Sequence, residues 1–342
     1  MKKKTLSILL IIFVLITGLF TACGTEDAEN NANGLLPTDE NGLLPTDEDE
    51  EHVITLYNAV VPLADFSAPK PAVSTVLMPV ASGTEVRKNQ KAQVDISNKQ
   101  DGYIMIRYTG RGGARTMTII TGPSGVQYVY YLRNDGEWEV FPLSDGNGSY
   151  TAAVFRNISG NQYSTEFTTS FNVTLKDKFA PFLRPNQYVN FSPNTIAVKE
   201  AATMVQGVTG THEKIKIIYN FVVAEFSYDK ALAQSVQSGY LPDLDKVWNA
   251  RKGICFDFAA LTTAMLRSQG IPTKLVVGYV GQVYHAWINV WVEDEGWVTA
   301  TIFFDGDSWN LMDPTFAAGA SSPERLARYI GDGSRYAAKF LY

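Results

Sequence analysis

The chain has 342 residues and a formal net charge of −6 at pH 7, and 45% of its residues are hydrophobic and 12% aromatic. This composition excludes a wholly disordered chain, because it supplies enough apolar surface for at least one large core. The length favours two domains over one.

The first 23 residues are expected to be a targeting segment. Three lysines precede an apolar run over residues 6–20, and Thr21 and Ala22 come directly before Cys23. This segment resembles a bacterial lipoprotein signal peptide. The resemblance implies that Cys23 is lipidated and becomes the mature N-terminus, on the extracellular face of the cell membrane. An uncleaved membrane anchor is the alternative, although the apolar run is shorter than the ~20 residues that span a bilayer.

Residues 24–51 form a predicted linker. The octapeptide Asn-Gly-Leu-Leu-Pro-Thr-Asp-Glu occurs at 33–40 and again, unchanged, at 41–48, and the linker holds ten acidic residues and no basic ones. Like charges repel along such a segment and keep it extended and solvated. We expect a spacer between the membrane and the folded part, with a recognition peptide in the repeat as the alternative.

Residues 52–178 are predicted to form an all-β domain, a sandwich of immunoglobulin-like type. Short runs rich in β-branched and aromatic residues alternate with glycine- and aspartate-containing turns. The expected strands lie at 103–108, 116–120, 126–132, 138–141, 150–155 and 167–175. Three prolines then mark a connector over residues 179–198.

A second domain over residues 199–342 begins with helical periodicity. Apolar residues recur at three- and four-residue spacing from Ile215 to Phe226, which predicts a core-facing helix with Thr211 as its cap and Glu213 in its first turn. His212 and Glu213 are half of a zinc-protease helix motif, but the second histidine is absent. We therefore expect His212 to be a surface residue.

Cys255 is the candidate nucleophile. Gly253 and Gly270 bracket a predicted helix that Pro272 prevents from continuing, so Cys255 falls in its first turn. The helix dipole and the first N–H groups favour a thiolate there. We expect the carboxylate of Asp257 to point away from the sulfur, because it would oppose thiolate formation. Small alanines later in the helix predict close packing against a sheet.

Lipidation would use Cys23 and leave Cys255 as a lone thiol outside the cytoplasm, which favours a reactive cysteine. An inert, buried cysteine is the alternative. The backbone N–H of Cys255 is the expected first oxyanion donor. Trp248 and Tyr228 are candidates for a second donor, and core packing is the alternative for each.

His285 and Asp313 are the candidate partners of the cysteine. Residues 274–280 and 283–292 are predicted to be consecutive strands joined by a tight turn, with His285 and Trp287 on one face of the second strand. Taken singly, His285 has the alternative of a structural strand histidine, and Asp313 that of an ordinary turn acid in an Asp-Pro pair.

Together these residues resemble the transglutaminase-like superfamily. The resemblance covers roughly residues 214–316 and is carried by Gly253-Ile254-Cys255, Gly270-Ile271-Pro272, His285-Ala286-Trp287 and Asp313-Pro314-Thr315. It implies an α+β fold, a papain-like transglutaminase core in which the helix bearing the cysteine packs on an antiparallel sheet, preceded by the β-sandwich. One departure is a longer path from His285 to Asp313, where residues 297–304 and 309–311 are predicted to form an added hairpin.

The mechanism that the resemblance implies has Cys255 attacking a carbonyl as thiolate, His285 moving the proton and Asp313 orienting the imidazole. We expect a surface-anchored cysteine acyl-transfer enzyme that acts on peptide or glutamine amides through a thioester. A peptidase is favoured over a transglutaminase, because bacterial members of the superfamily are thought to include many proteases. The alternative is a non-catalytic or weakly active module that grips a cell-wall polymer or protein through Trp287, Trp291, Trp297 and Trp309.

No cofactor or metal is expected. Three histidines and one spare cysteine do not make a convincing zinc site, and no loop has the spacing of an EF-hand. The expected partners are a protein or peptide substrate and the membrane, through the lipid on Cys23, with no nucleic acid.

Overall fold

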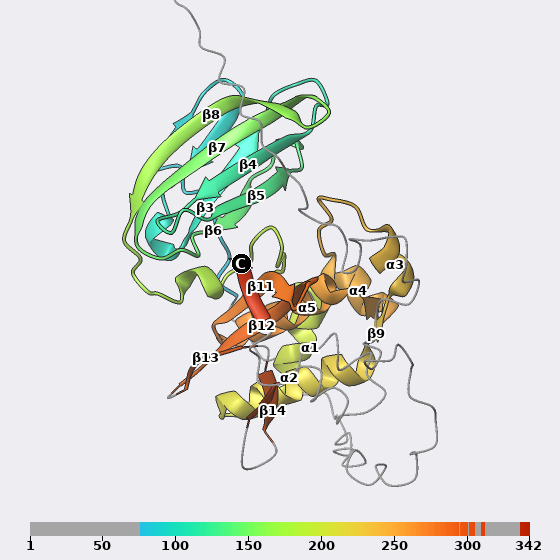
Figure 1. Ribbon diagram of the computed structural model, residues 1–342. Coiled ribbons are helices and arrows are strands. Elements are labelled where there is room, and N and C mark those ends of the chain that lie inside the picture. Colours follow the sequence, from blue (N-terminus) through green and yellow to red (C-terminus); the bar gives the residue numbers. More distant parts are fainter. Residues whose placement is uncertain (1–75, 294, 300, 305–308, 312–335) are drawn as a thin grey trace, which may run out of the picture.

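The computed structural model describes residues 76–293, 295–299, 301–304, 309–311 and 336–342. The predicted signal peptide and linker lie outside these residues, as does Asp313. Figure 1 shows a strand-rich part, which comes first in the chain, beside a part that mixes helices and strands. None of the helices in the described ranges is long and apolar enough to cross a membrane.

The strand-rich part consists of two antiparallel four-stranded sheets. Their orders are β1-β2-β3-β6 and β5-β4-β7-β8. The strands are β1 Val86–Lys88, β2 Ala92–Asp95, β3 Tyr103–Tyr108, β4 Thr116–Thr121, β5 Gln127–Leu132, β6 Glu139–Pro142, β7 Gly148–Ser159 and β8 Gln162–Val173. Ile104 and Ile106 of the first sheet share a core with Tyr130 and Val154 of the second, since alternate residues of each strand face inward. The six predicted strands are confirmed, and the immunoglobulin-like type stays a prediction.

The connector is hydrogen-bonded to the strands. It contains a short 3₁₀ helix, η2 Ala180–Phe182, and then an extended stretch. The Gln187 amide donates a hydrogen bond to the Glu139 carboxylate at 2.8 Å, and the Tyr188 hydroxyl donates one to the Val129 carbonyl at 3.2 Å. This segment therefore joins the two parts as a buried element.

Five α-helices follow in the part of the chain that the structure describes. They are α1 Ile196–Met204, α2 Thr211–Glu225, α3 Lys230–Ser235, α4 Leu244–Ala250 and α5 Cys255–Ser268. Helix α2 buries the apolar face predicted for it, but the expected cap at Thr211 is wrong by one position. Gly210 takes the extended cap conformation and Thr211 is the first helical residue. His212 is a surface residue as predicted, and it pairs with Glu295 at 3.1 Å.

The second part contains an antiparallel sheet of order β13-β12-β11-β16. Its strands are β11 Thr273–Val280, β12 Val283–Val292, β13 Gly296–Thr299 and β16 Tyr336–Leu341. The predicted hairpin is confirmed, with Val280 opposite Val283. Two small pairs complete the described strands, parallel β9 Ser227–Tyr228 with β10 Lys252–Gly253 and antiparallel β14 Thr301–Phe304 with β15 Trp309–Leu311.

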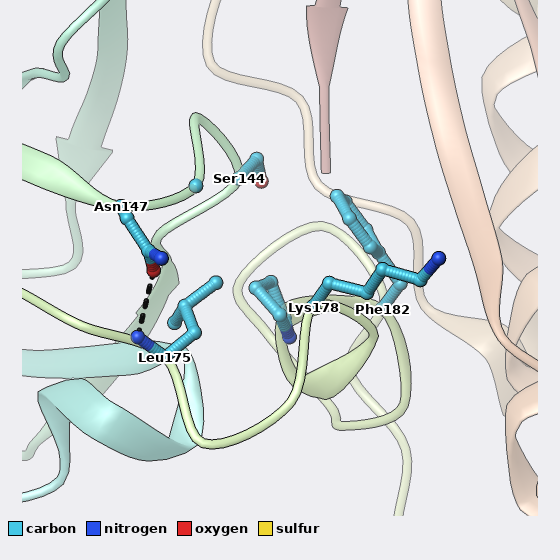
Figure 2. Close-up of a pocket in the computed structure, with 7 residues that line it drawn as sticks. Ser144, Asn147, Leu175, Lys178 and Phe182 are labelled. Atoms are coloured by element: carbon cyan, nitrogen blue, oxygen red, sulfur yellow. Dashed lines mark hydrogen bonds between the residues drawn. The ribbon is translucent and has the colours of Figure 1, made fainter.

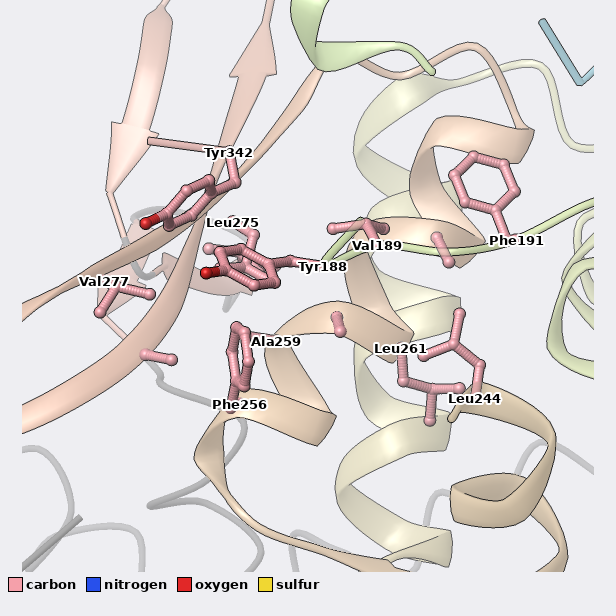
Figure 3. Close-up of a cluster of buried hydrophobic side chains, with 14 of the residues drawn as sticks. Tyr188, Val189, Phe191, Leu244, Phe256, Ala259, Leu261, Leu275, Val277 and Tyr342 are labelled. Atoms are coloured by element: carbon pink, nitrogen blue, oxygen red, sulfur yellow. The ribbon is translucent and has the colours of Figure 1, made fainter. Parts of the chain in front are cut away.

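The two parts share one continuous core. The ring of Tyr342 lies 5.7 Å from that of Tyr130 in β5 and 4.6 Å from that of Tyr188 in the connector. Tyr188 in turn packs edge-on against Phe256 of α5, with 5.3 Å between ring centroids. Figure 3 shows this cluster between the sheet and the helix. The β-sandwich is therefore packed directly against the elements that carry the predicted site.

Candidate functional site

Cys255 is the first residue of α5, so its predicted place in the first turn is confirmed. Ile254 before it is extended, with φ −101° and ψ 176°, and the chain becomes helical at the cysteine. Cys255 is 3% exposed. The nucleophile considered below is the thiol of the reduced protein.

Helix α5 is packed on the sheet by small and apolar side chains. All 14 of its residues are buried. Figure 3 shows Phe256 and Ala259 of α5 in one buried apolar cluster with Leu275 and Val277 of β11. The predicted close packing of this helix against a sheet is confirmed, and it holds the start of the helix in a fixed position on the core.

Asp257 is fully buried in the first turn of the same helix. Its Oδ2 accepts a hydrogen bond from the backbone N–H of Ile254 at 2.9 Å, and its Oδ1 accepts one from the Tyr240 hydroxyl at 2.7 Å. Burial raises the pKa of Asp257 to about 6, the two hydrogen bonds lower it, and the Asp229 carboxylate raises it. Both carboxylate oxygens are thus engaged by groups other than the cysteine, in line with the expectation from the sequence.

His285 lies on β12 and is 3% exposed. Its backbone is opposite Gly278 of β11. Its ring lies nearly parallel to that of Trp287, at 18° and with 6.3 Å between centroids. The predicted sharing of one strand face by His285 and Trp287 is confirmed.

The two faces of β12 have different neighbours. Trp287 packs in a small cluster with Val276 and Val280, whereas Ala286 and Ile288 belong to the large core that includes α5. The structure therefore brings the two elements together and buries both Cys255 and His285, with His285 on the face of Trp287. Contact between the sulfur and the imidazole, which the triad requires, stays a prediction.

The third predicted member, Asp313, lies outside the described residues. The chain before it contains the expected extra hairpin in part, because β14 pairs with β15 in antiparallel fashion. Residues 296–299 do not belong to this hairpin as predicted, since they form β13 and pair with β12 in the main sheet. This insertion between His285 and Asp313 is the departure from the family pattern that the sequence predicts.

Trp248 and Tyr228 differ in how they lie relative to the cysteine. Trp248 is 7% exposed, and the Arg251 guanidinium lies 4.2 Å from the centroid of its ring, which favours core packing. Tyr228 pairs in parallel with Gly253, two residues before Cys255. Of the two candidates for a second oxyanion donor, Tyr228 is the one beside the turn that carries the cysteine.

A cavity of about 270 Å³ lies elsewhere, between the β6–β7 turn and the connector (Figure 2). It is lined by Ser144, Gly146, Asn147, Leu175, Lys178, Pro181 and Phe182. Neither Cys255 nor His285 lines this cavity, so it is separate from the candidate site. Within the described ranges, no group of three or more histidine, cysteine or acidic side chains is placed to hold a metal ion.

The sequence did not indicate the role of Tyr240 beside α5. This residue is 17 positions before Asp257, in the loop between α3 and α4, and no local pattern links the two. A tyrosine three residues before the N-cap of α4, Asp243, is too common a feature to have been a signal.

Comparison with known proteins identifies a family for part of the chain. Residues 199–302 match the profile of the transglutaminase-like superfamily. A protein-glutamine gamma-glutamyltransferase of Pseudomonas aeruginosa is 27% identical over 96 residues, which are 24% of this chain and 12% of that protein. An uncharacterized protein of Mycobacterium leprae is 30% identical over 154 residues, 41% of this chain and 46% of that protein. The chain thus matches less than half the length of either relative.

Solved structures give a weaker likeness. One from Cytophaga hutchinsonii, named provisionally as a cysteine protease, has a TM-score of 0.32 and 16% identity, over 63% of this chain and 72% of that one. A TM-score of this size carries no argument about activity. The family match over residues 199–302 is the comparison on which the functional reasoning depends.

Proposed function

We propose that the protein is a cysteine acyl-transfer enzyme that acts on peptide or glutamine side-chain amides, because residues 199–302 match the transglutaminase-like superfamily. The observation that carries the proposal is Cys255 at the start of a buried helix that packs on the hairpin bearing His285. A cysteine at a helix N-terminus is favoured as thiolate by the dipole and the nearby N–H groups.

The proposed reaction has two halves. The Cys255 thiol gives its proton to His285 and the sulfur attacks the amide carbonyl, which forms a tetrahedral oxyanion. The intermediate collapses to a thioester as the C–N bond breaks, and the imidazolium returns the proton to the leaving amine. Water or a second amine then attacks the thioester, loses its proton to His285, and releases the thiol. Asp313 is proposed to orient the imidazole throughout.

Hydrolysis is the proposed first activity. Water is present at every open site, whereas transfer to an amine requires a site that binds the amine and keeps water out. The named activity of the Pseudomonas aeruginosa relative, protein-glutamine gamma-glutamyltransfer, supports amine transfer as the second candidate. The enzyme is proposed to work on the extracellular face of the membrane, anchored by a lipid on Cys23.

The binding-module alternative finds less support in the aromatic residues named for it. Trp287 is 1% exposed and offers no surface to a polymer. Trp291 and Trp297 contact each other with 5.6 Å between centroids, and the ammonium of Lys274 lies 3.8 Å from the Trp297 ring centroid. The side chain of Trp309 lies outside the described residues. Each of the described rings thus makes contacts within the protein, and Trp291 and Trp297 are half-buried.

To test the proposal, the reduced protein is incubated with a glutamine-containing peptide, with and without a primary amine, and the products are identified. Chain cleavage supports the peptidase, and incorporation of the amine supports the transglutaminase. We expect Cys255→Ala and His285→Ala to abolish either product while keeping the unfolding transition. Absence of both products, or products that persist in Cys255→Ala, would refute the proposal.

A further inference from the structure

We infer that Asp257 is a positioning residue for Cys255, which holds the backbone turn in front of the cysteine with the help of Tyr240. The inference deepens the proposed function, since it concerns the same cysteine. It assigns Asp257 no contact with substrate, because both of its oxygens are engaged by the protein.

The first step is the hydrogen bond from Asp257 back to the chain before the cysteine. The Ile254 N–H, which immediately precedes Cys255, donates to Asp257 Oδ2 at 2.9 Å in a fully buried setting. A charged acceptor at the third position of a helix satisfies one of the N–H groups left unpaired at the start of the helix. This bond ties the residues on both sides of Cys255 to each other.

The second step is the close packing at Gly253. A Cβ added at Gly253 would lie 2.8 Å from the Asp257 Cβ and 3.1 Å from its Oδ2, which is too close for an ordinary contact. On its other side, the Gly253 carbonyl accepts a hydrogen bond from the Asp229 N–H at 2.7 Å. The turn from Gly253 to Cys255 is therefore fixed from two directions, and Asp257 supplies one of them.

The third step is the support that Tyr240 gives to the carboxylate. The Tyr240 hydroxyl donates to Asp257 Oδ1 at 2.7 Å from the loop between α3 and α4. This loop rests on β5 of the sandwich, where the Ser238 hydroxyl lies 3.4 Å from that of Tyr131 and a Cβ at Gly239 would be 3.2 Å from the Tyr131 ring. The sandwich thereby positions the loop that carries Tyr240, and Tyr240 in turn hydrogen-bonds to the Asp257 carboxylate.

The electrostatic surroundings of Asp257 support the same positioning role. Among the described residues, the groups that face the Asp257 carboxyl are the Ile254 amide and the Tyr240 hydroxyl, with the Asp229 carboxylate as the nearby charge, and none of them is a cation. A buried carboxylate without a cationic partner costs stability, and such groups concentrate at functional sites. The two hydrogen bonds lower the pKa of Asp257, so loss of the Tyr240 hydroxyl is expected to raise it.

The experiment measures how fast iodoacetamide labels Cys255 in the reduced, full-length protein, with the labelled peptide identified by mass spectrometry. The variants are Asp257→Ala, Asp257→Asn and Tyr240→Phe. Asp243→Asn is the matched control, because Asp243 also accepts a bond from a helix N–H, that of Lys246, but is exposed. Thermal unfolding of every variant is recorded beside the rates.

We expect Asp257→Ala to slow labelling about tenfold or more, since small displacements of a reacting group cost large factors in rate. Asp257→Asn keeps an acceptor for Ile254 and should restore most of the rate. In the wild type the rate should show an inflection near pH 6, where Asp257 titrates. That inflection should be missing in Asp257→Asn and shifted to higher pH in Tyr240→Phe.

A purely structural role gives a different result. A lower unfolding temperature with unchanged labelling rate and unchanged pH profile in Asp257→Ala would overturn the inference. If that variant does not fold, Tyr240→Phe decides, because it deletes one hydroxyl, and an unshifted inflection would overturn the inference equally. His285→Ala separates the two proposals. Unchanged labelling in it counts against activation by histidine in the proposed function and leaves the role of Asp257 standing.

Discussion

Replacement of Asp257 by asparagine should stabilise the protein at neutral pH. Burial raises the pKa of this carboxyl from 3.8 to about 6. Between these two pH values the folded protein binds more protons than the unfolded chain, so its free energy of unfolding falls as the pH rises. A rise of about two pKa units corresponds to about 3 kcal/mol at neutral pH, which is the cost of keeping the buried group ionised. Asparagine carries no charge and removes this cost.

Urea unfolding at pH 4 and pH 7 checks the prediction, because the free energy extrapolated to water is obtained for each variant at each pH. The difference between Asp257→Asn and wild type should grow in favour of the variant from pH 4 to pH 7, by up to about 3 kcal/mol. The control, Asp243→Asn, should show the opposite sign, because the Lys246 side chain lowers the pKa of Asp243. A difference between Asp257→Asn and wild type that is the same at both pH values would refute the reasoning.

Two further substitutions test the packing around the site. Arg267→Met should lower the free energy of unfolding by a few kcal/mol, as measured by urea titration. Three backbone carbonyls lose their hydrogen-bond donor, and each unsatisfied carbonyl costs about 1–3 kcal/mol. Removal of the buried charge offsets only part of this cost. Equal stability would show that the carbonyls find other partners. Gly278→Ala should lower the melting temperature, since its Cβ would lie 2.1 Å from the Ala337 carbonyl oxygen, and overpacking of this kind costs about 1–3 kcal/mol. An unchanged melting temperature would mean that β16 moves away from residue 278 without a loss of stability.

Local features of the site could be predicted from the sequence. Gly253 and Gly270 interrupt the helical pattern before and after α5. Cys255 is accordingly the first residue of the helix. Period-two alternation placed His285 and Trp287 on one strand face, as their ring contact confirms. Signals of this kind depend on residues that are neighbours along the chain.

Long-range contacts could not be predicted in this way. Arg267 lies in the last turn of α5, yet its guanidinium donates to main-chain oxygens of Arg184, Thr273 and Tyr342, up to 83 residues away. These acceptors are backbone atoms, so no side-chain pattern marks them. The same holds for the bond from Tyr240 to Asp257, which depends on a loop being held by the other part of the protein. Strands β1 and β2 were missed for a different reason, because three and four residues are too short to show alternation.

The position of β16 has a consequence for the order in which the protein is assembled. Among the described elements β16 is synthesised last, yet it pairs with β11 at the edge of the sheet. The ring of Tyr342 contacts Tyr130 of β5 and Tyr188 of the connector. Because a chain leaves the ribosome from its N-terminus, β11 and Tyr188 lack these partners until residues 336–342 have emerged. The aromatic cluster around Tyr188 is therefore incomplete until that point in synthesis.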